Sequence, residues 1–295
     1  MINVIIVEDE PAIARGLSLL ITQNYCDFQV LALCRNGKDG LQKILELKPD
    51  LIFTDISMPG MNGLDMIQEL RSRQMDTRCV ILTGYAEFKY AQTAITLGVS
   101  DYLLKPIAPN TLDNILTTCR TQHQSTLRSL RSEYLQKILL DDTQPEDGYL
   151  PLLSCSCTLL FFFSGPMRSN LYTETIISPD FLPVEKQAIE KLEEKHKISL
   201  FLLHGRHHNE KVAAITAPVS QPLDIDLISQ EICQLIRPLD ACFHLVISNT
   251  VTDCQKLQEL TRSAYLYALF KVPFGIDSIQ KCQALTDEPI HVSAK

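Results

Sequence analysis

Five short apolar runs in the first 105 residues predict the strands of a buried sheet, and they occupy residues 4–7, 30–33, 51–54, 80–82 and 102–104. The segments between them repeat apolar residues at steps of three and four, which is the spacing of one face of a helix. After the first run, for example, this face is formed by Ile13, Leu17, Leu20 and Ile21. Regular alternation of strand and helix predicts an α/β domain with a parallel sheet that helices cover on both faces.

The same spacing continues through residues 109–141 and predicts one long helix, whose seam is Leu112, Leu116, Cys119, His123, Leu127, Leu130, Tyr134 and Ile138. Two interpretations remain open. The seam pairs with the same helix of a second copy, which would give a homodimer through residues 109–141. Alternatively, the helix is an amphipathic linker that folds back onto the chain's own domains. Polar His123 and the glutamines beside it interrupt a continuous coiled coil.

The acidic, turn-rich segment 141–148 predicts a domain boundary. Beyond it, strands are predicted at 159–163, 199–203, 212–215 and 243–247, and helices at 184–197, 224–236 and 253–270. The second and third of these strands flank a turn at 205–210 and predict a hairpin. The order βαββαβ indicates an α+β ferredoxin-like sandwich. The chain is thus divided into a first domain (1–122), a helical linker (123–148) and a second domain (149–290).

Composition narrows the class of protein. The chain has 295 residues, of which 45% are hydrophobic, enough for two domains with their own cores. No apolar run approaches the ~20 residues of a membrane span, and the start does not resemble a signal peptide, so we expect a cytoplasmic protein without a membrane partner. Most of the ten cysteines, such as Cys79, Cys233 and Cys242, lie in apolar stretches. They are expected to be reduced thiols that act as small hydrophobic residues.

The charge distribution gives no sign of a nucleic-acid surface. Residues 1–120 contain 11 basic and 14 acidic residues, and the remainder contains 16 and 21, so both parts are negative. The predicted helix within 224–239 lacks the run of basic residues that a helix in a DNA groove needs. Residues 271–295 are too few for a pair of helix-turn-helix units. DNA binding is therefore not supported within this chain.

Candidate chemistry lies where the predicted strands end. Glu8 and Asp9 follow the first strand, Asp55 the third, Thr83 the fourth and Lys105 the fifth. The carboxyl ends of parallel strands form one crevice, so these residues should meet. Crowded carboxylates repel one another unless a cation lies among them, and Mg²⁺ suits an oxygen site that also contacts phosphate. Asp55 would then be the nucleophile that accepts a phosphoryl group, with Lys105 and Thr83 contacting the phosphoryl oxygens.

Each of these residues has an ordinary structural interpretation when taken alone. A single carboxylate after a strand, such as Asp9 or Asp101, is usually a helix N-cap. A lone Lys-Pro is usually a turn, and Tyr102 alone is a half-buried core residue. The coincidence of four such sites in this order favours the functional interpretation, because a site is recognised by converging roles.

The segments VIIVEDEP, DISMPGMNG, ILTGYAEFKYA and GVSDYLLKPI resemble the receiver domain of two-component response regulators, particularly the AraC-type (YesN-like) regulators. The resemblance implies a flavodoxin-like (βα)5 fold over residues 1–122. It also implies that a sensor histidine kinase phosphorylates Asp55 in a phosphorelay, with transcription regulation as output. Such a protein is a phosphoacceptor and no enzyme beyond weak self-dephosphorylation. A protein-interaction switch without DNA binding of its own is the alternative output.

The resemblance also assigns roles within the site. Mg²⁺ would be held by Asp9, Asp55 and the Ser57 carbonyl directly, and by Glu8 through water. Lys105 would contact phosphate, and the bond between it and Pro106 would be cis. Thr83 would swing toward the phosphoryl group while Tyr102 turns inward.

Two features depart mildly from the family pattern. Glu8 stands where aspartate is common, and Gly84 stands where alanine is frequent. Ser57 and Tyr85 are expected to influence hydrolysis by shaping water access.

A second resemblance, in SNTVTDCQKLQELTRSAYLYALF, is to the degenerate cyclase-like domain of some regulators and covers residues 150–280. The turn at 205–210 lacks the paired glycines and adjacent acids of a working diguanylate cyclase, so nucleotide cyclisation is not expected. His204, His207 and His208 could bind a metal, but no acidic or cysteine partner is placed by sequence. Solvated turn histidines are the favoured interpretation.

Overall fold

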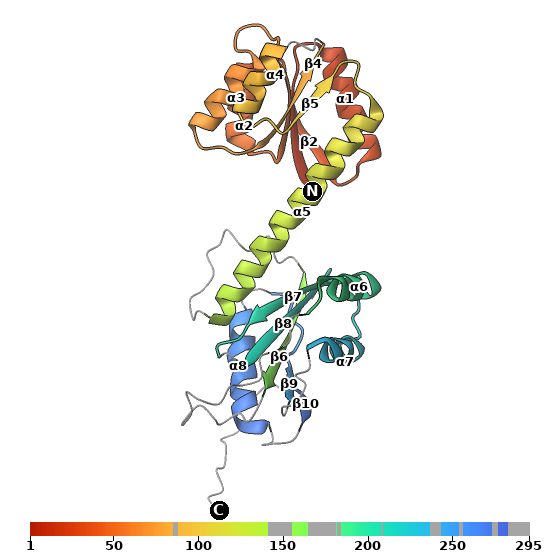
Figure 1. Cartoon of the computed structure of the whole chain (residues 1–295), viewed down its shortest axis with the longest axis vertical. Coiled ribbons are helices and arrows are strands. Elements are labelled where there is room, and N and C mark those ends of the chain that lie inside the picture. Colours follow the sequence, from red (N-terminus) through yellow and green to blue (C-terminus); the bar gives the residue numbers. More distant parts are fainter. Residues whose placement is uncertain are drawn as a thin grey trace, which may run out of the picture. The chain divides into compact units, whose positions relative to one another are not determined.

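The computed structural model describes residues 1–84, 88–140, 155–164, 181, 184–207, 209–236, 243–253, 256–272 and 277–282. The chain forms two compact units, Met1–Thr126 and Leu127–Lys295. Each unit is described by itself below (Figure 1). The boundary between them falls inside one helix, α5.

The first unit alternates strand and helix, as the apolar pattern predicts. Its strands are β1 (Ile2–Val7), β2 (Phe28–Cys34), β3 (Leu51–Asp55), β4 (Arg78–Thr83) and β5 (Asp101–Leu104). Its helices are α1 (Pro11–Asn24), α2 (Gly37–Leu47), α3 (Gly63–Ser72), α4 (Phe88–Thr96) and the start of α5 (Pro109–Leu140). All strand pairs are parallel, in the order β2-β1-β3-β4-β5. This is the flavodoxin-like order, and the prediction of a (βα)5 domain is confirmed.

The sheet of the first unit is buried on both faces. Successive side chains of a strand point to opposite faces, so β1 sends Val4 and Ile6 to one core and Ile5 and Val7 to the other. Helices α1 and α5 cover the first face, and α2, α3 and α4 cover the second. Because both faces of the sheet are buried, the strands are continuous apolar runs. Their polar residues lie at the carboxyl ends of the strands.

Side-chain caps explain where two helices begin. The side chain of Asn36 accepts a hydrogen bond from the Asp39 backbone N–H and caps α2, and Asn62 does the same with Asp65 at α3. Each cap satisfies a backbone donor that the first helical turn leaves without a partner. The cap at α3 fixes the point where the chain leaves the carboxyl end of β3 and turns into the helix.

The second unit contains β6 (Ser156–Ser164), α6 (Lys186–His196), β7 (Ser199–His204), β8 (Glu210–Ala217), α7 (Ile225–Ile236), β9 (Phe243–Ile247), α8 (Lys256–Lys271) and β10 (Ser278–Lys281). The strand order is β10-β9-β6-β8-β7. Within it, β9-β6-β8-β7 are antiparallel neighbours, which is the ferredoxin-like arrangement predicted from βαββαβ.

Two details of the second unit differ from the prediction. Strand β10, which pairs in parallel with β9, was not predicted, because its four residues have no apolar run and Ile279 is exposed at the sheet edge. Strand β8 begins at Glu210 rather than at residue 212, so Glu210 lies in the sheet and not in the turn. Its charge concealed its place in the strand.

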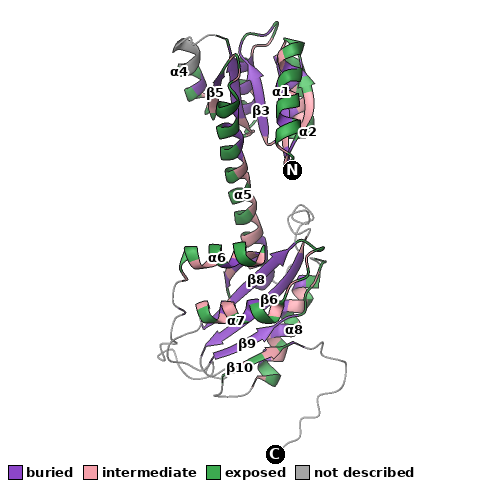
Figure 2. Ribbon diagram, turned by 90° about the vertical axis from the view of Figure 1, so that its right-hand side faces the viewer, coloured by how far each residue is buried: buried purple, intermediate pink, exposed green. Residues whose placement is uncertain are grey.

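Helices cover both faces of the second sheet (Figure 2). Every residue of the central strand β6 is buried. Leu160 and Phe162 pack in the core formed with α6 and α7. Phe161 and Phe163 pack in the core formed with α8 and the end of α5. The run of five large apolar residues in β6 thus reflects two separate cores.

The predicted long helix is confirmed as α5, up to its end at Leu140. Its seam is divided between the two units. Leu112, Leu116 and Cys119 are buried in the core of the first unit, and Tyr134 and Ile138 in a core of the second. Both ends of the seam are therefore covered by the chain's own cores, as the linker interpretation requires. His123, Leu127 and Leu130 between them are partly exposed.

Side chains of α5 also cover the edge strand β7. The Gln136 amide donates to the His204 carbonyl at 2.8 Å and accepts from the His204 N–H at 2.9 Å. Arg128 donates to the Leu200 carbonyl at 2.8 Å, and its guanidinium lies over the Phe201 ring. Uncovered edge strands pair readily with other chains, and these contacts protect this one.

The cysteines of the described residues are free thiols, and most of them are buried. Burial raises the pKa of the Cys34 thiol to about 12 and that of Cys79 to about 11. Both thiols therefore stay neutral and act as apolar side chains, as predicted. Cys242 lies outside the described residues. Among the described helices, none is long and apolar enough to cross a membrane.

Candidate functional site

The predicted site residues lie together at the carboxyl ends of the first sheet. Glu8 and Asp9 follow β1, and Asp55 is the last residue of the neighbouring strand β3. One carboxylate oxygen from each of the three acids lies within 4.8 Å of those of the other two. The side chain of Glu8 is fully buried, and that of Asp55 is 10% exposed. Residues up to 47 positions apart in sequence thus form one acidic cluster, at the point where the strand order of the sheet reverses.

Lys105 comes to the same point from the end of β5. Its Nζ donates to Asp55 Oδ2 at 2.6 Å and to Glu8 Oε1 at 2.9 Å. Its backbone N–H donates to the Thr83 carbonyl at 2.7 Å, which ties the lysine to the end of β4. The bond between Lys105 and Pro106 is cis, as the resemblance implies.

One ammonium does not satisfy this set of acids. Lys105 Nζ lies 2.7 Å from Glu8 Oε2 and 2.9 Å from Glu8 Oε1, so one ammonium is shared by both oxygens of Glu8 and by Asp55 Oδ2. Burial raises the pKa of Glu8, against the opposing effect of Lys105. Burial also disfavours the Lys105 ammonium, but its bonds to Asp55 and Glu8 outweigh this and raise its pKa. Three acids that lie around a single ammonium fit a divalent cation that prefers oxygen ligands.

The backbone around Asp55 fixes the direction of its carboxylate. The Ser57 N–H donates to Asp55 Oδ1 at 3.1 Å, so the two carboxylate oxygens have different partners. Ile56 and Met58 on either side of Ser57 are buried, whereas Ser57 itself is exposed. The loop after β3 is therefore held by two apolar anchors and presents Ser57 toward solvent beside the acid.

Gly63 is a site residue that the sequence analysis did not single out, although it is the last residue of the motif DISMPGMNG. A Cβ atom added at Gly63 would lie 2.0 Å from the Asp55 carbonyl oxygen and 2.8 Å from Thr54 Oγ1. The Gly63 N–H donates to the Ile56 carbonyl at 3.1 Å. The first residue of α3 thus packs directly on the backbone of Asp55. A glycine immediately after a capping asparagine, where most residues are tolerated, was the available signal.

The two proposed switch residues lie on adjacent strands. Thr83 is buried at the end of β4, and Tyr102 is half-buried in β5, opposite Ile81. Gly84 is exposed beside Thr83, and Tyr85 lies outside the described residues. The switching role of Thr83 and Tyr102 stays a prediction.

The described histidines of the second unit do not form a comparable site. His204 is exposed at the end of β7, with its backbone bound by Gln136. His208 lies outside the described residues. Among the described residues, the group of three ligand side chains close enough to hold a metal ion is Glu8, Asp9 and Asp55. His207 instead lines a cavity that is considered below.

Comparison with known proteins agrees with this geometry. Residues 4–117 match the family model of the response regulator receiver domain. This part of the chain is a response regulator receiver domain. The resemblance inferred from the motifs is thereby confirmed.

The relatives of the receiver domain include named regulators. The uncharacterized transcriptional regulatory protein YesN of Bacillus subtilis is 32% identical over 106 residues, covering 36% of this chain and 29% of that protein. The transcriptional regulatory protein HptR of Staphylococcus aureus is 33% identical over 151 residues, covering 48% of this chain and 59% of that protein. The chain thus spans less than two thirds of the length of these relatives.

A solved structure is also similar to the receiver domain. It is the REC domain of AraT, a response regulator from Geobacillus stearothermophilus, at 35% identity and a TM-score of 0.40. The match covers 42% of this chain and 96% of that one.

Proposed function

We propose that the chain is a response regulator of a two-component system, acting in the cytoplasm, which a sensor histidine kinase phosphorylates on Asp55. The observation that carries the proposal is the contact of 2.6 Å between Lys105 Nζ and Asp55 Oδ2 beside the buried Glu8. A carboxylate that is held by a lysine, next to two further acids and at the mouth of a parallel sheet, suits acceptance of a phosphoryl group.

In the transfer, a carboxylate oxygen of Asp55 forms a bond to phosphorus. The bond from phosphorus to the donor histidine nitrogen breaks, and that nitrogen keeps the electron pair. The Lys105 ammonium, now bonded to Asp55, is placed to contact a phosphoryl oxygen, and the Thr83 hydroxyl is the second donor. Little further chemistry is needed, because the reaction depends on positioning and charge neutralisation. The chain is therefore a phosphoacceptor and no enzyme beyond weak self-dephosphorylation.

Asp9, Asp55 and the Ser57 carbonyl would hold Mg²⁺ directly, and Glu8 would hold it through water. When bound, the ion neutralises charge on the transferring phosphoryl group. Within the chain, the Glu8 carboxylate is fully buried close to Asp55, so a nearby cation would offset repulsion that solvent screens poorly.

Magnesium binding gives a test with a readout besides phosphorylation. We expect Mg²⁺ to raise the unfolding temperature of the full chain, because it relieves repulsion among the three acids; at 100 times Kd the stabilisation is about 2.7 kcal/mol. Asp9→Asn should remove most of this shift, and chelation with EDTA should reverse it in the unmodified chain. Sodium chloride of equal ionic strength is the control. An equal shift in the Asp9→Asn variant would contradict the assignment of the ligands.

Transcription regulation is the output that the relatives favour, since YesN and HptR carry that description. The alternative is a switch that acts through a protein partner, and the negative charge of both parts of the chain favours it. Dimerisation through α5 stays a prediction, which the partly exposed His123, Leu127 and Leu130 leave open.

A gel-shift titration across salt separates the two outputs. With both halves of the chain acidic, we expect no shift of the chain alone on duplex DNA from 50 to 200 mM salt, where a DNA-binding protein loses affinity by roughly 10³–10⁵. Binding that weakens steeply with salt would instead establish direct DNA recognition and reject the protein-interaction output.

A further inference from the structure

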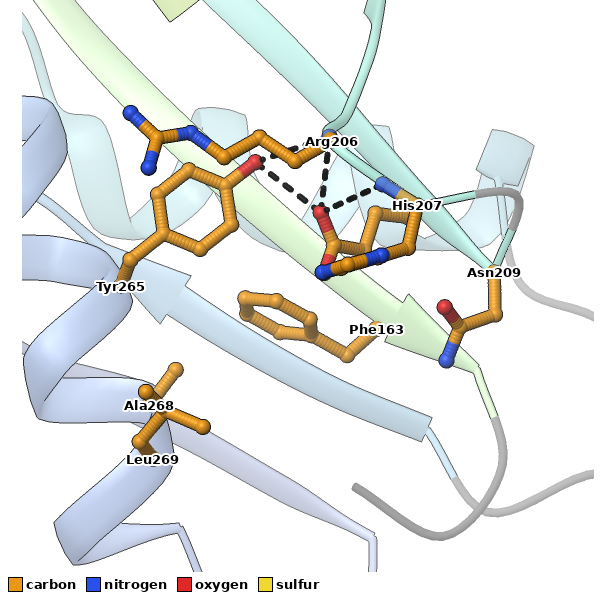
Figure 3. Close-up of a pocket in the computed structure, with 8 residues that line it drawn as sticks. Phe163, Arg206, His207, Asn209, Tyr265, Ala268 and Leu269 are labelled. Carbon is orange, nitrogen blue, oxygen red and sulfur yellow. Dashed lines mark hydrogen bonds between the residues drawn. The ribbon is translucent and has the colours of Figure 1, made fainter. Parts of the chain in front are cut away.

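A cavity of about 170 Å³ lies in the second unit between the β7–β8 hairpin and α8 (Figure 3). Its apolar wall is formed by Phe163 of β6 and by Ala268 and Leu269 of α8. Its polar wall comes from the hairpin and from α8, and consists of Arg206, His207, Asn209, Glu210 and Tyr265. Ligand pockets of this composition usually measure roughly 300–1,000 Å³, so an occupant of this one is a small organic molecule.

Glu210 breaks the apolar pattern of its strand at this cavity. It is paired across the ladder with Phe163, and the same face of β8 continues with Val212 and Ala214 in the core. Glu210 is nevertheless 8% exposed. An acid at a core-facing position costs stability unless it is well paired or serves a function.

The backbone at Gly205 leaves room for the Glu210 side chain. A Cβ atom at Gly205 would lie 2.3 Å from Glu210 Cβ and 2.8 Å from its Oε2. Any side chain at position 205 would therefore displace the acid. The glycine at the start of the hairpin and the glutamate at its end belong to one arrangement.

The hydrogen bonds of Glu210 converge on one of its two oxygens. Oε2 accepts from the Arg206 N–H at 2.9 Å, the His207 N–H at 3.3 Å and the Tyr265 hydroxyl at 3.0 Å. Burial, with Glu210 adding to its effect, raises the pKa of Tyr265, so its hydroxyl remains a donor. Three donors thus fix the orientation of the carboxylate. None of these bonds uses Oε1.

The Arg206 guanidinium contacts the Tyr265 ring and the end of α5. Its guanidinium lies 4.8 Å from the centre of the Tyr265 ring, and its Nε donates to the Leu139 carbonyl at 3.1 Å. Figure 3 shows the Arg206 side chain running across Tyr265 and away from Phe163 and Leu269. Within the lining, Glu210 supplies the acid, and Phe163, Ala268 and Leu269 supply the apolar surface.

We propose that this cavity binds a small organic ammonium compound, with its cationic group on Glu210 and its apolar body between Phe163 and Leu269. A charge-assisted hydrogen bond to a buried carboxylate and contact of a cation with an aromatic face both favour such a ligand. The ring and the aliphatic side chains take the apolar body. This site is independent of the phosphoacceptor site, since all its residues belong to the second unit.

The test is ligand-observed NMR and calorimetry on the full chain with 2-phenylethylammonium as the probe. The carboxylate 3-phenylpropionate has the same body with the opposite charge, and methylammonium has the charge without the body. We expect the ammonium probe to bind at least about tenfold more tightly than either, the scale of one hydrogen bond to a charged group. Equal binding of the cation and the carboxylate, or no binding of the cation, would overturn the proposal.

Two variants locate the binding. Glu210→Gln keeps an acceptor for the hairpin N–H groups but lacks the charge, and should lose the tenfold preference. Leu269→Trp adds bulk at the rim, where the side chain is 58% exposed, and should abolish binding without disturbing the fold. Leu266→Trp, on the same helix at 45% exposure and outside the cavity lining, is the matched control and should bind normally. Binding that survives Leu269→Trp would place the probe elsewhere and refute the site.

Discussion

Replacing Asp55 by asparagine is expected to reduce labelling of the chain by radioactive acetyl phosphate to background. The amide has nearly the same shape but no anionic oxygen to attack phosphorus. It can still accept the hydrogen bond from the Ser57 N–H, and Lys105 keeps its bonds to Glu8. The loss should therefore come from chemistry and not from misfolding. Label in denaturing gels, after incubation with Mg²⁺, measures it.

The folding of this variant gives the internal control. Asp55 lies within 4.8 Å of Glu8, so removal of its charge relieves repulsion as well as removing an ion pair. We expect its unfolding temperature to stay the same or to rise. Asp76→Asn changes an aspartate whose side chain is fully exposed in the same unit, and should label normally. Persistent labelling of Asp55→Asn would remove the central assignment.

Gly63→Ala is expected to destabilise the receiver domain by about 1–3 kcal/mol, the usual cost of overfilling a packed site. The new methyl group would lie 2.0 Å from the Asp55 carbonyl oxygen, so either β3 or α3 must move. The Gly63 N–H bond to Ile56 opposes a shift of the helix. The displacement falls on the backbone of the phosphoacceptor, so labelling should slow as well. Hydrogen exchange of β3 peptides in the full chain reports the stability.

Gly16→Ala is the matched control for this substitution. Gly16 lies within α1, and a Cβ atom there would meet nothing within 4 Å. Alanine in place of a helical glycine should stabilise α1 by about 0.5–1 kcal/mol. The two substitutions are chemically identical, so opposite signs are the expected result. Destabilisation of similar size in both would show that packing on Asp55 is not the cause.

The strands of the receiver domain and the positions where they end were predictable from sequence, because each of these signals is local. Apolar runs such as residues 4–7 and 51–54 are buried on both faces, and the polar residues that end them cannot enter the core. The proximity of Asp55 and Lys105 could be predicted because parallel strands align their carboxyl ends. The apolar spacing of α5 predicted the helix equally clearly, but it did not show which residues pack against it. An apolar seam indicates only that some surface covers it.

The apolar pattern of the sequence did not predict contacts between residues far apart in the chain. Strand β10 has no apolar run because it lies at a sheet edge and depends on pairing with β9. Glu210 was assigned to a turn because charge normally excludes a residue from a buried strand. Its place in the sheet depends on donors from the hairpin and on Tyr265, which lies 55 residues later. The close packing of Gly63 on the Asp55 backbone likewise depends on how closely α3 approaches β3.

The sequence by itself determined the periodicities, and through them the alternation of strands and helices and the end of the sheet at which the acids and the lysine lie. Periodicity depends on the geometry of single elements, which the chain carries locally. Only the tertiary structure decided which surface covers each half of α5, how Lys105 is shared between Glu8 and Asp55, and where Glu210 finds its donors. These outcomes depend on distances between elements, and such distances arise only when the side chains of both partners pack together.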